Sequence, residues 1–250
     1  MENKIIYHKQ IDSTNTELSR MALRGASHGT VVLADAQTAG KGRRGRRWES
    51  PVGENIYMSL LLRPEMQPEK APMLTLVMAY CVAKVLKKQG FEKVQIKWPN
   101  DLVLSGKKVC GILTEMSLDG NQIQHVIVGV GINVNNQAFP EEIKGMATSL
   151  RMERGRFIDR KEIVENILVE FWKEYERFVE VGNLSQIWEI YNDMLVNCGK
   201  EVCVLEPESA YEAVALGINQ EGQLRVRLEN GEEKEIFAGE VSVRGIYGYV

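Results

Sequence analysis

The stretch VQIKWPNDLVLSGKKVCGILTEM, residues 94–116, sets the core of the fold. Three short runs within it are rich in β-branched and other apolar residues, at 94–98, 101–104 and 109–116. Such runs favour β-strands, and Pro99 ends the first because proline cannot donate to a strand ladder. Ser105-Gly106-Lys107 is short enough to form a tight turn. The stretch therefore predicts three consecutive strands, the last two forming a hairpin.

The flanking sequence predicts further strands and helices around this hairpin. Additional strands are expected at 5–7, 30–34, 56–62 and 125–133. Apolar residues at helical spacing predict helices at 72–88, 159–182 and 184–196. Another helix is expected to begin within 12–17, with Thr14 and Glu17 at the spacing of a capping box. Together these elements predict an α+β fold, a mixed sheet backed by helices.

From Cys198 onward the pattern changes to short strands with alternating side chains. These strands are expected within 201–206, 211–218, 223–229, 233–238 and 240–246. Asn230-Gly231 indicates a hairpin turn, because both residues tolerate positive φ. A segment of about 55 residues built this way is typical of a small SH3-like β-barrel. We therefore expect a large domain at 1–196 and a small C-terminal domain at 197–250.

Composition excludes several classes of function. The 250 residues are 44% hydrophobic and 26% charged, with a formal net charge of −3, as in soluble globular proteins. No apolar run is long enough to span a membrane, and no leader-like segment follows Met1. The four cysteines lack CxxC spacing and are expected to be buried thiols. These features predict a cytoplasmic protein that binds neither membrane nor nucleic acid.

The segment Gly40 to Trp48, GKGRRGRRW, is a basic loop. Five of the seven residues from Lys41 to Arg47 are Lys or Arg, with glycines between them. Glycine lets backbone N–H groups turn toward an anion, and arginine forms two-pronged hydrogen bonds to phosphate or carboxylate. The loop is thus a candidate anion site. A solvated basic loop or a non-specific nucleic-acid patch fits this segment, taken alone, equally well.

Lys97-Trp98-Pro99-Asn100-Asp101 is a second candidate. Lys108 follows Asp101 by seven residues on the return strand of the predicted hairpin, so the two side chains can lie side by side. A carboxylate beside a lysine suits a site where charge is stabilised and a proton is removed. An ordinary cross-strand ion pair explains the same pattern.

Glycines recur in two predicted strands, at Gly111 and in Gly129-Val130-Gly131-Ile132-Asn133. Glycine weakens a strand, so repeated glycines suggest that a ligand or another chain passes close to the backbone. The second run lacks the GxGxxG pattern of dinucleotide sites. Close packing against a helix is the alternative.

Taken in order, these motifs resemble those of biotin protein ligases. The matching segments are DSTN at 12–15, AQTAGKGRRGRRW at 36–48, KWPNDL at 97–102, GKKVCGIL at 106–113, GVGIN at 129–133 and GEVSVRG at 239–245. They extend over nearly the whole chain in the family's order. The resemblance implies a class II synthetase-like catalytic domain followed by an SH3-like barrel.

The resemblance also implies a two-step reaction. Biotin attacks the α-phosphate of ATP to give biotinyl-5′-AMP, and a lysine of a biotin carboxyl carrier domain then takes the biotinyl group. The carrier would belong to acetyl-CoA carboxylase or a related carboxylase, and Mg²⁺ would accompany ATP. The metal ligands stay unknown, and a homodimer through sheet edges is compatible with the family.

By the family's pattern, one set of residues would bind biotin and another would bind ATP and the adenylate. The biotin set comprises Ser13, Thr14, Asn15, Gln37, Gly111, Gly129 and Gly131. The nucleotide set comprises Gly40, Gly42, Arg43, Arg44, Gly45, Arg46, Trp48, Asn100, Lys108, Asn133 and Arg244. The catalytic residues would be Lys108, which stabilises charge, Asp101, which orients or deprotonates the incoming lysine, and Arg43.

Two departures from the family's pattern matter. Lys41 stands where an arginine is common, which keeps the charge but loses the planar fork. The first motif begins at Asp12, which leaves no room for the winged-helix domain of relatives that repress transcription. We therefore expect ligase activity without repressor activity.

Three other functional hypotheses compete with that of a biotin protein ligase. Lipoate or octanoate ligases and transferases share the catalytic fold but lack the basic loop. A nucleic-acid-binding protein would use the Arg43 to Arg47 cluster, but no recognition helix accompanies that cluster. A non-catalytic scaffold would use the C-terminal barrel to bind a partner.

Overall fold

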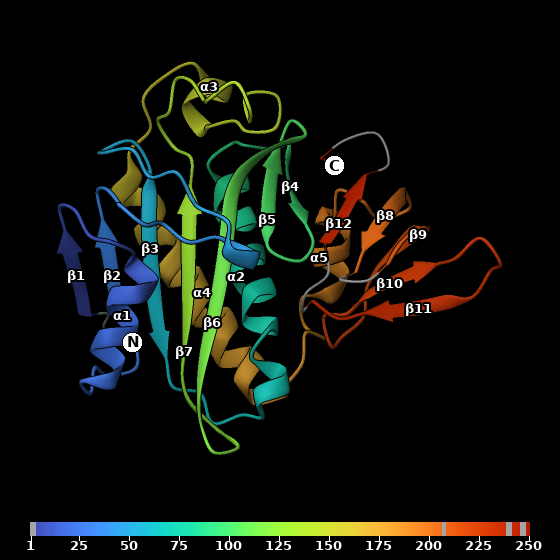
Figure 1. The fold of residues 1–250 in the computed structure, drawn as a ribbon, viewed down its shortest axis with the longest axis horizontal. Coiled ribbons are helices and arrows are strands. Elements are labelled where there is room, and N and C mark those ends of the chain that lie inside the picture. Colours follow the sequence, from blue (N-terminus) through green and yellow to red (C-terminus); the bar gives the residue numbers. More distant parts are fainter. Residues whose placement is uncertain (1–3, 207–208, 239–241, 246–248) are drawn as a thin grey trace.

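The computed structural model describes all residues except 1–3, 207–208, 239–241 and 246–248, and its described part contains two sheets (Figure 1). The larger sheet has seven strands in the order β1-β2-β3-β7-β6-β5-β4. Their bounds are β1 Lys4–His8, β2 Thr30–Ala34, β3 Ile56–Leu62, β4 Val94–Lys97, β5 Asp101–Leu104, β6 Lys107–Asp119 and β7 Gln122–Ile132. The pair β1–β2 is parallel and the other pairs are antiparallel, so the predicted mixed sheet is confirmed.

The stretch that opened the sequence analysis forms β4, β5 and β6, and the predicted hairpin between β5 and β6 is confirmed. Lys97 pairs with Asp101 across β4–β5, and Asp101 pairs with Gly111 across β5–β6. The register shifts between Leu102 and Val103, so that Val103 faces Lys108. Strand β6 is longer than predicted. Its last residues, 117–119, also pair with β7, but the polar Ser117 and Asp119 interrupt the apolar pattern on which the prediction was based.

The helices cover both faces of the sheet. Their bounds are α1 Thr14–Leu23, α2 Met73–Lys88, α3 Leu150–Arg154, α4 Arg160–Val181 and α5 Trp188–Met194, with 3₁₀ turns η1 Arg43–Gly45 and η2 Pro68–Lys70. Helices α2 and α4 lie together behind the sheet in Figure 1, while α1 lies in front of it. Alternating strand residues separate the two cores: Leu60 packs with the α2 side, whereas Leu61 packs with Leu18 of α1.

Several helix boundaries differ from those predicted. The N-cap of α1 is Ser13, whose side chain accepts from the backbone of Thr16, so the capping box at Thr14 is wrong by one residue. Asp159 caps α4 as predicted, and Gly182 ends it with φ of 76°. Helix α5 covers only part of 184–196, and α3 was not predicted because it is a single short turn.

The smaller sheet forms the C-terminal part of the molecule. Its strands are β8 Glu201–Leu205, β9 Ala210–Ile218, β10 Leu224–Arg227, β11 Glu233–Ile236 and β12 Ser242–Gly245, in the order β11-β10-β9-β8-β12. All its pairs are antiparallel, as expected of a small SH3-like domain. Residues 239–241 of the GEVSVRG motif and residue 246 of the predicted last strand lie outside the described residues.

The two sheets are in contact. The indole Nε1 of Trp98, just after β4, donates to the backbone oxygen of Gly222, and Gly222 packs against Leu76 and Leu184. One buried cluster extends from α2 and α4 into β8, β9 and β10. This contact brings β12 beside β4, the edge strand of the large sheet, which positions the site described below (Figure 1). Among the described residues, no helix is both long and apolar enough to cross a membrane.

Candidate active site

One cavity lies above the middle of the large sheet. It measures about 470 Å³, including the space open to solvent. Its lining residues are Ser13, Thr14, Asn15, Gln37, Lys41, Gly42, Arg43, Trp48, Tyr57, Asn100, Lys108, Gly111, Ile112, Leu113, Gly129, Val130 and Gly131. The structure therefore brings together all seven residues that the resemblance assigned to biotin. We call this space the first cavity.

A polar network lies along one wall of the first cavity. The backbone N–H of Thr14 donates to Oε1 of Gln37 at 2.8 Å. Asn15 accepts from the Ser59 hydroxyl and donates from Nδ2 to Oε2 of Glu115 at 2.7 Å. Ser59 and Glu115 were missed by the sequence analysis, although Ser59 is a polar residue in a largely apolar strand. The network holds Thr14 and Asn15 in fixed orientations.

The glycines of the first cavity make room for side chains rather than turning the backbone. A Cβ at Gly129 would lie 2.0 Å from Oδ1 of Asn15. Cβ atoms at Gly111 and Gly131 would lie 2.8 Å and 2.6 Å from the indole of Trp48. The structure therefore favours close approach of side chains as the reason for these glycines. The Nε1 of Trp48 is buried without a hydrogen-bond partner among the described residues, so it can donate to a ligand.

A second cavity of about 720 Å³ adjoins the first and reaches the C-terminal sheet. Among its described lining residues, Asp101 is the only acidic one, against seven basic ones. The basic residues are Arg43, Arg44, Arg46, Arg47, Lys97, Lys108 and Arg244. Such an excess of positive charge favours anions strongly. Gly42, Arg43, Trp48, Asn100 and Lys108 line both cavities, so the two spaces meet at Lys108.

Asp101 and Lys108 form the pair that the hairpin predicted. Nζ of Lys108 lies 2.6 Å from Oδ1 of Asp101, and the Tyr249 hydroxyl donates to Oδ2. The Asp101 side chain is 13% exposed. Burial opposes its charge, but Lys108, Tyr249 and Lys97 outweigh burial and lower the pKa of this carboxyl. Asp101 is therefore ionised and accepts hydrogen bonds at neutral pH.

Lys97 is buried beside this pair. It is 5% exposed, and its ammonium lies 4.2 Å from the ring centroid of Tyr249. Burial lowers the pKa of Lys97 to about 8, since the nearby Lys108, Arg244 and Arg46 reinforce burial and Asp101 only partly compensates. No role was assigned to Lys97 from the sequence, although it stands in the quoted motif.

Arg43 attaches the basic loop to the segment between β4 and β5 and to the segment that follows β11. Its guanidinium donates to Oδ1 of Asn100 at 3.0 Å and to the backbone oxygen of Ala238 at 2.7 Å. Lys41 adds a second attachment through Glu115 at 3.3 Å. Arg44, the next residue after Arg43, adopts φ of 58°, a left-handed conformation that non-glycine residues rarely take. The loop is thus held across the first cavity while Arg44 stays exposed.

The remaining predicted residues lie at different places. Arg244, on β12, lines the second cavity together with Arg46. Gly40 and Gly45 line a neighbouring open hollow around the basic loop instead. Asn133 is buried outside both cavities and donates from Nδ2 to the backbone oxygen of Thr148. Its predicted contact with the nucleotide has no support from this geometry.

No cluster of three or more His, Cys, Asp or Glu side chains able to hold a metal ion occurs among the described residues. Asp101 is the carboxylate nearest the excess of positive charge. Mg²⁺ sites that serve nucleotides often use one or two carboxylates together with substrate phosphates. The donor set therefore fits a magnesium ion carried mainly by ATP, and not a dedicated protein cage.

Family models match both parts of the chain. The model of the biotin/lipoate A/B protein ligase family matches residues 7–133, which include the basic loop and the large-sheet residues that line the two cavities. The model of the biotin protein ligase C terminal domain matches residues 198–244. The fold and the site thus define a protein of the biotin and lipoate ligase class.

Individual relatives narrow this class. The chain is 37% identical to the bifunctional ligase/repressor BirA of Bacillus subtilis (strain 168), over 97% of this chain and 75% of that protein. It is 31% identical to the biotin–[acetyl-CoA-carboxylase] ligase of Paracoccus denitrificans, over 91% and 98%. The biotin protein ligase from Aquifex aeolicus in complex with biotin and ATP superposes with a TM-score of 0.84 at 34% identity, over 98% and 100%. The chain belongs to the biotin/lipoate A/B protein ligase family, among its biotin protein ligases.

Proposed function

We propose that this chain activates biotin with ATP and transfers the biotinyl group to a lysine of a biotin carboxyl carrier domain. One observation carries the proposal: a polar cavity and a more strongly cationic cavity meet at Lys108, beside Asp101. A small acid bound in the first cavity and a nucleotide phosphate bound in the second would place their reacting atoms at this junction.

The first cavity suits the head of biotin. The ureido group offers one carbonyl oxygen and two N–H groups, so it needs both donors and acceptors. Ser13, Thr14, Asn15 and Gln37 supply both kinds, and the network through Glu115 fixes Asn15. Gly111 and Gly131 let the Trp48 indole pack against the cavity wall, and the aliphatic tail would lie beside this indole. The tail's carboxylate would then reach Lys108.

The second cavity suits the phosphates of ATP. In the first step a biotin carboxylate oxygen bonds to the α-phosphorus, the bond to the bridging oxygen breaks, and pyrophosphate leaves with that electron pair. Repulsion between the carboxylate and the phosphates opposes this step. Lys108, Arg43, Arg44, Arg46 and Arg244 would offset the repulsion. Gly42 and Trp48 would close the loop side of the adenylate.

The proposal includes Mg²⁺, because ATP would bind as its magnesium complex. The ion would supply further positive charge to the phosphate oxygens, and Asp101 is the carboxylate that could complete its coordination. Asn100, held between Arg43 and the backbone of Ile112, would fix the wall beside the phosphates.

In the second step the acceptor amine attacks the acyl carbon of the mixed anhydride. The carbon–oxygen bond breaks, AMP leaves with that electron pair, and the nitrogen loses a proton. The lowered pKa of Asp101 keeps this carboxylate ionised, so it would orient the amine, and it would accept the proton once the bonded nitrogen has become acidic. Trp48 and the basic loop would limit hydrolysis of the adenylate by water.

The proposal also covers the protein that accepts biotin, the location of the enzyme, its domain boundary and its oligomeric state. We propose a carrier domain of acetyl-CoA carboxylase or a related carboxylase as the acceptor, by analogy with the ligase of Paracoccus denitrificans. We also propose a cytoplasmic location and the division into domains at residue 197. Strand β1 ends the large sheet with Tyr7 60% exposed, which would allow a homodimer through this edge.

The test is the mass of a purified carrier domain after incubation with this protein, biotin and MgATP. We expect a gain of one biotinyl group that requires ATP and the target lysine, with a Lys→Arg carrier as the control. A gain with lipoate but not with biotin would overturn the substrate assignment. No gain together with no turnover of ATP would overturn the enzymatic assignment.

A further inference from the structure

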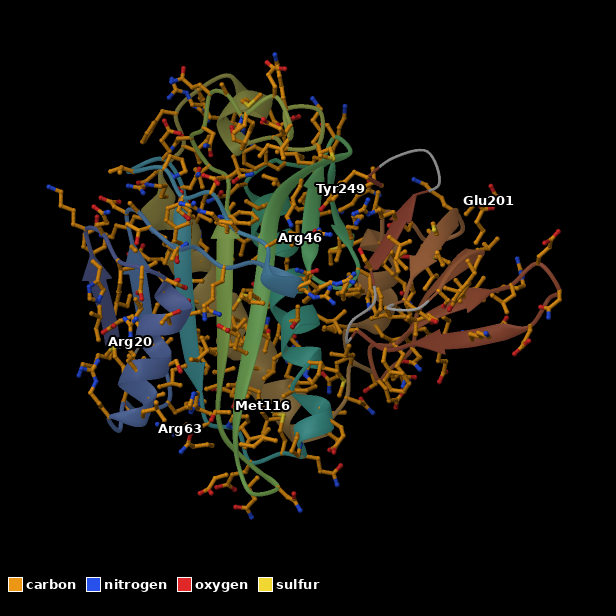
Figure 2. All side chains as sticks on the ribbon, viewed as in Figure 1. Arg20, Arg46, Arg63, Met116, Glu201 and Tyr249 are labelled. Atoms are coloured by element: carbon orange, nitrogen blue, oxygen red, sulfur yellow. The ribbon has the colours of Figure 1, made fainter. Side chains whose placement is uncertain are left out.

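The last described residues of the chain reach into the active site from the C-terminal domain. Figure 2 shows Tyr249 at the junction between the two sheets, above the basic loop that carries Arg46. The hydroxyl of Tyr249 donates to Oδ2 of Asp101, and its ring lies under the ammonium of Lys97. Tyr249 also lines the second cavity. No role in the reaction proposed above requires these contacts.

The position of Tyr249 is supported by the packing of Val250. The side chain of Val250 lies at van der Waals distance from the place of a Cβ at Gly106, in the β5–β6 turn. A Cβ at Gly245, the last residue of β12, would lie 2.3 Å from the backbone oxygen of Val250. The terminus is thus packed between the two sheets, and the phenol is directed at Asp101.

Tyr249 donates to Asp101 in the way an acceptor amine must. The amine N–H and the phenol O–H are both donors to a carboxylate, and Lys108 already engages Oδ1. Because the Asp101 side chain is only 13% exposed, an incoming amine needs the space that the phenol takes. Burial, together with the Asp101 carboxylate, raises the pKa of Tyr249, so the phenol keeps its proton as a donor.

We infer that the Tyr249 hydroxyl occupies the place of the acceptor amine at Asp101 and must leave when the acceptor lysine arrives. The inference rests on the proposed function, because it concerns the transfer step of that reaction. Tyr249 is then a positioning residue that limits access to Asp101. Its ring contact with Lys97 holds the phenol in place between turnovers.

The test separates the two half-reactions in the full-length protein. Biotinyl-adenylate is formed on the enzyme, free ligands are removed, and the complex is mixed with carrier domain in a single turnover. The measured quantity is the ratio of the transfer rate, at low carrier concentration, to the rate of adenylate formation. The Tyr249→Phe variant keeps the ring and removes only the hydroxyl.

Tyr211→Phe is the matched control. The hydroxyl of Tyr211 also donates to a carboxylate, that of Glu206, and Lys234 lies 5.4 Å from its ring centroid, but it lines neither cavity. For Tyr249→Phe we expect the ratio to rise about threefold to tenfold, the equivalent of one hydrogen bond. The effect should be larger in the KM for carrier than in kcat. Tyr211→Phe should leave the ratio at the parental value.

A second nucleophile sharpens the test. A small primary amine has no docking surface, so its reaction with the bound adenylate reports access to Asp101 alone. We expect Tyr249→Phe to accelerate this reaction as well. A ratio that stays unchanged or falls in Tyr249→Phe, in a parent that transfers biotin, overturns the inference alone. A parent that forms no biotinyl-adenylate overturns the proposed function and the inference together.

Discussion

Two partly buried groups of charged side chains show what distinguishes an ion cluster that stabilises the fold from one that binds a substrate. The helix cluster joins α2 to α4 and comprises Lys84, Lys88, Glu170, Glu174 and Arg177. Its three cations face two carboxylates at contact distance, so most of its charge is compensated. Burial opposes the charge of Lys84, but its bonds to the two glutamates outweigh burial and raise its pKa.

The site cluster surrounds Asp101, where one carboxylate faces Lys97, Lys108 and the arginines of the second cavity. Here the compensation is incomplete, and the pKa of Lys97 falls to about 8. The pKa of Lys84 is thus raised, whereas that of Lys97 is lowered, although both lysines belong to the same fold. An uncompensated excess of positive charge lowers stability unless an anion binds, which makes it a mark of function rather than of folding. Substitutions in the site cluster should therefore slow the reaction, and substitutions in the helix cluster should lower the free energy of unfolding.

The largest effect is expected for Lys108→Ala. Loss of the ammonium at the junction of the cavities should slow adenylate formation about 10²- to 10³-fold, because charge on the reacting oxygens loses its nearest stabilising group. Release of pyrophosphate would be measured. Lys107→Ala, on the same strand but outside both cavities, is the control and should retain the parental rate. An equal loss in both variants would contradict the assignment.

Lys84→Ala should act on stability and not on catalysis. The change leaves Glu170 and Glu174 buried with less compensation, which should lower the free energy of unfolding by about 2–3 kcal/mol. Denaturant unfolding measures this value. The exposed pair Lys161–Glu165 supplies the control, since Lys161→Ala should cost less than about 1 kcal/mol. A slower reaction in Lys84→Ala at temperatures where it is folded would weaken the comparison.

Gly129→Ala should raise the KM for biotin about tenfold, because the new methyl group overlaps Oδ1 of Asn15 and displaces it. Steady-state kinetics with biotin as the varied substrate would measure the effect. A Cβ at Gly145 meets nothing within 4 Å, so Gly145→Ala is the matched control. The prediction is wrong if both variants bind biotin as the parent does.

The smallest effect concerns pH. Below about pH 8 Lys97 carries a charge that attracts phosphate, and above it the lysine is neutral. The affinity for ATP should therefore fall roughly fivefold as the pH rises through this value. Titrations at several pH values would show a step that is absent from Lys97→Met. A step of equal size in that variant would assign the titration to another group.

Much of the fold was predictable because apolar periodicity reports local structure. The boundaries of β2, β3 and β5 agree with the prediction, since each strand is buried on both faces or ends at a turn residue. Local patterns could not place α3, nor the N-cap of α1, where five consecutive residues, Asp12 to Thr16, are all of types that cap helices.

The site was predictable only where sequence neighbours carry it. Asp101 and Lys108 lie on the two adjacent strands of one hairpin, so the contact of their side chains could be expected from local pairing. Glu115 reaches Asn15 across the sheet, and Tyr249 reaches Asp101 from the other sheet. Such contacts depend on how the elements pack, which no local pattern encodes. Gly129 lines the first cavity, and only the structure shows that its missing Cβ makes room for Asn15.

The central claim is that the site cluster exists to form an acyl-adenylate from biotin and ATP. Exchange of labelled pyrophosphate into ATP tests it most directly, because this exchange requires the first step to run in both directions. We predict exchange that depends on biotin, that is nearly lost in Lys108→Ala and that persists in Lys84→Ala. Exchange without biotin, or undiminished exchange in Lys108→Ala, would contradict the claim.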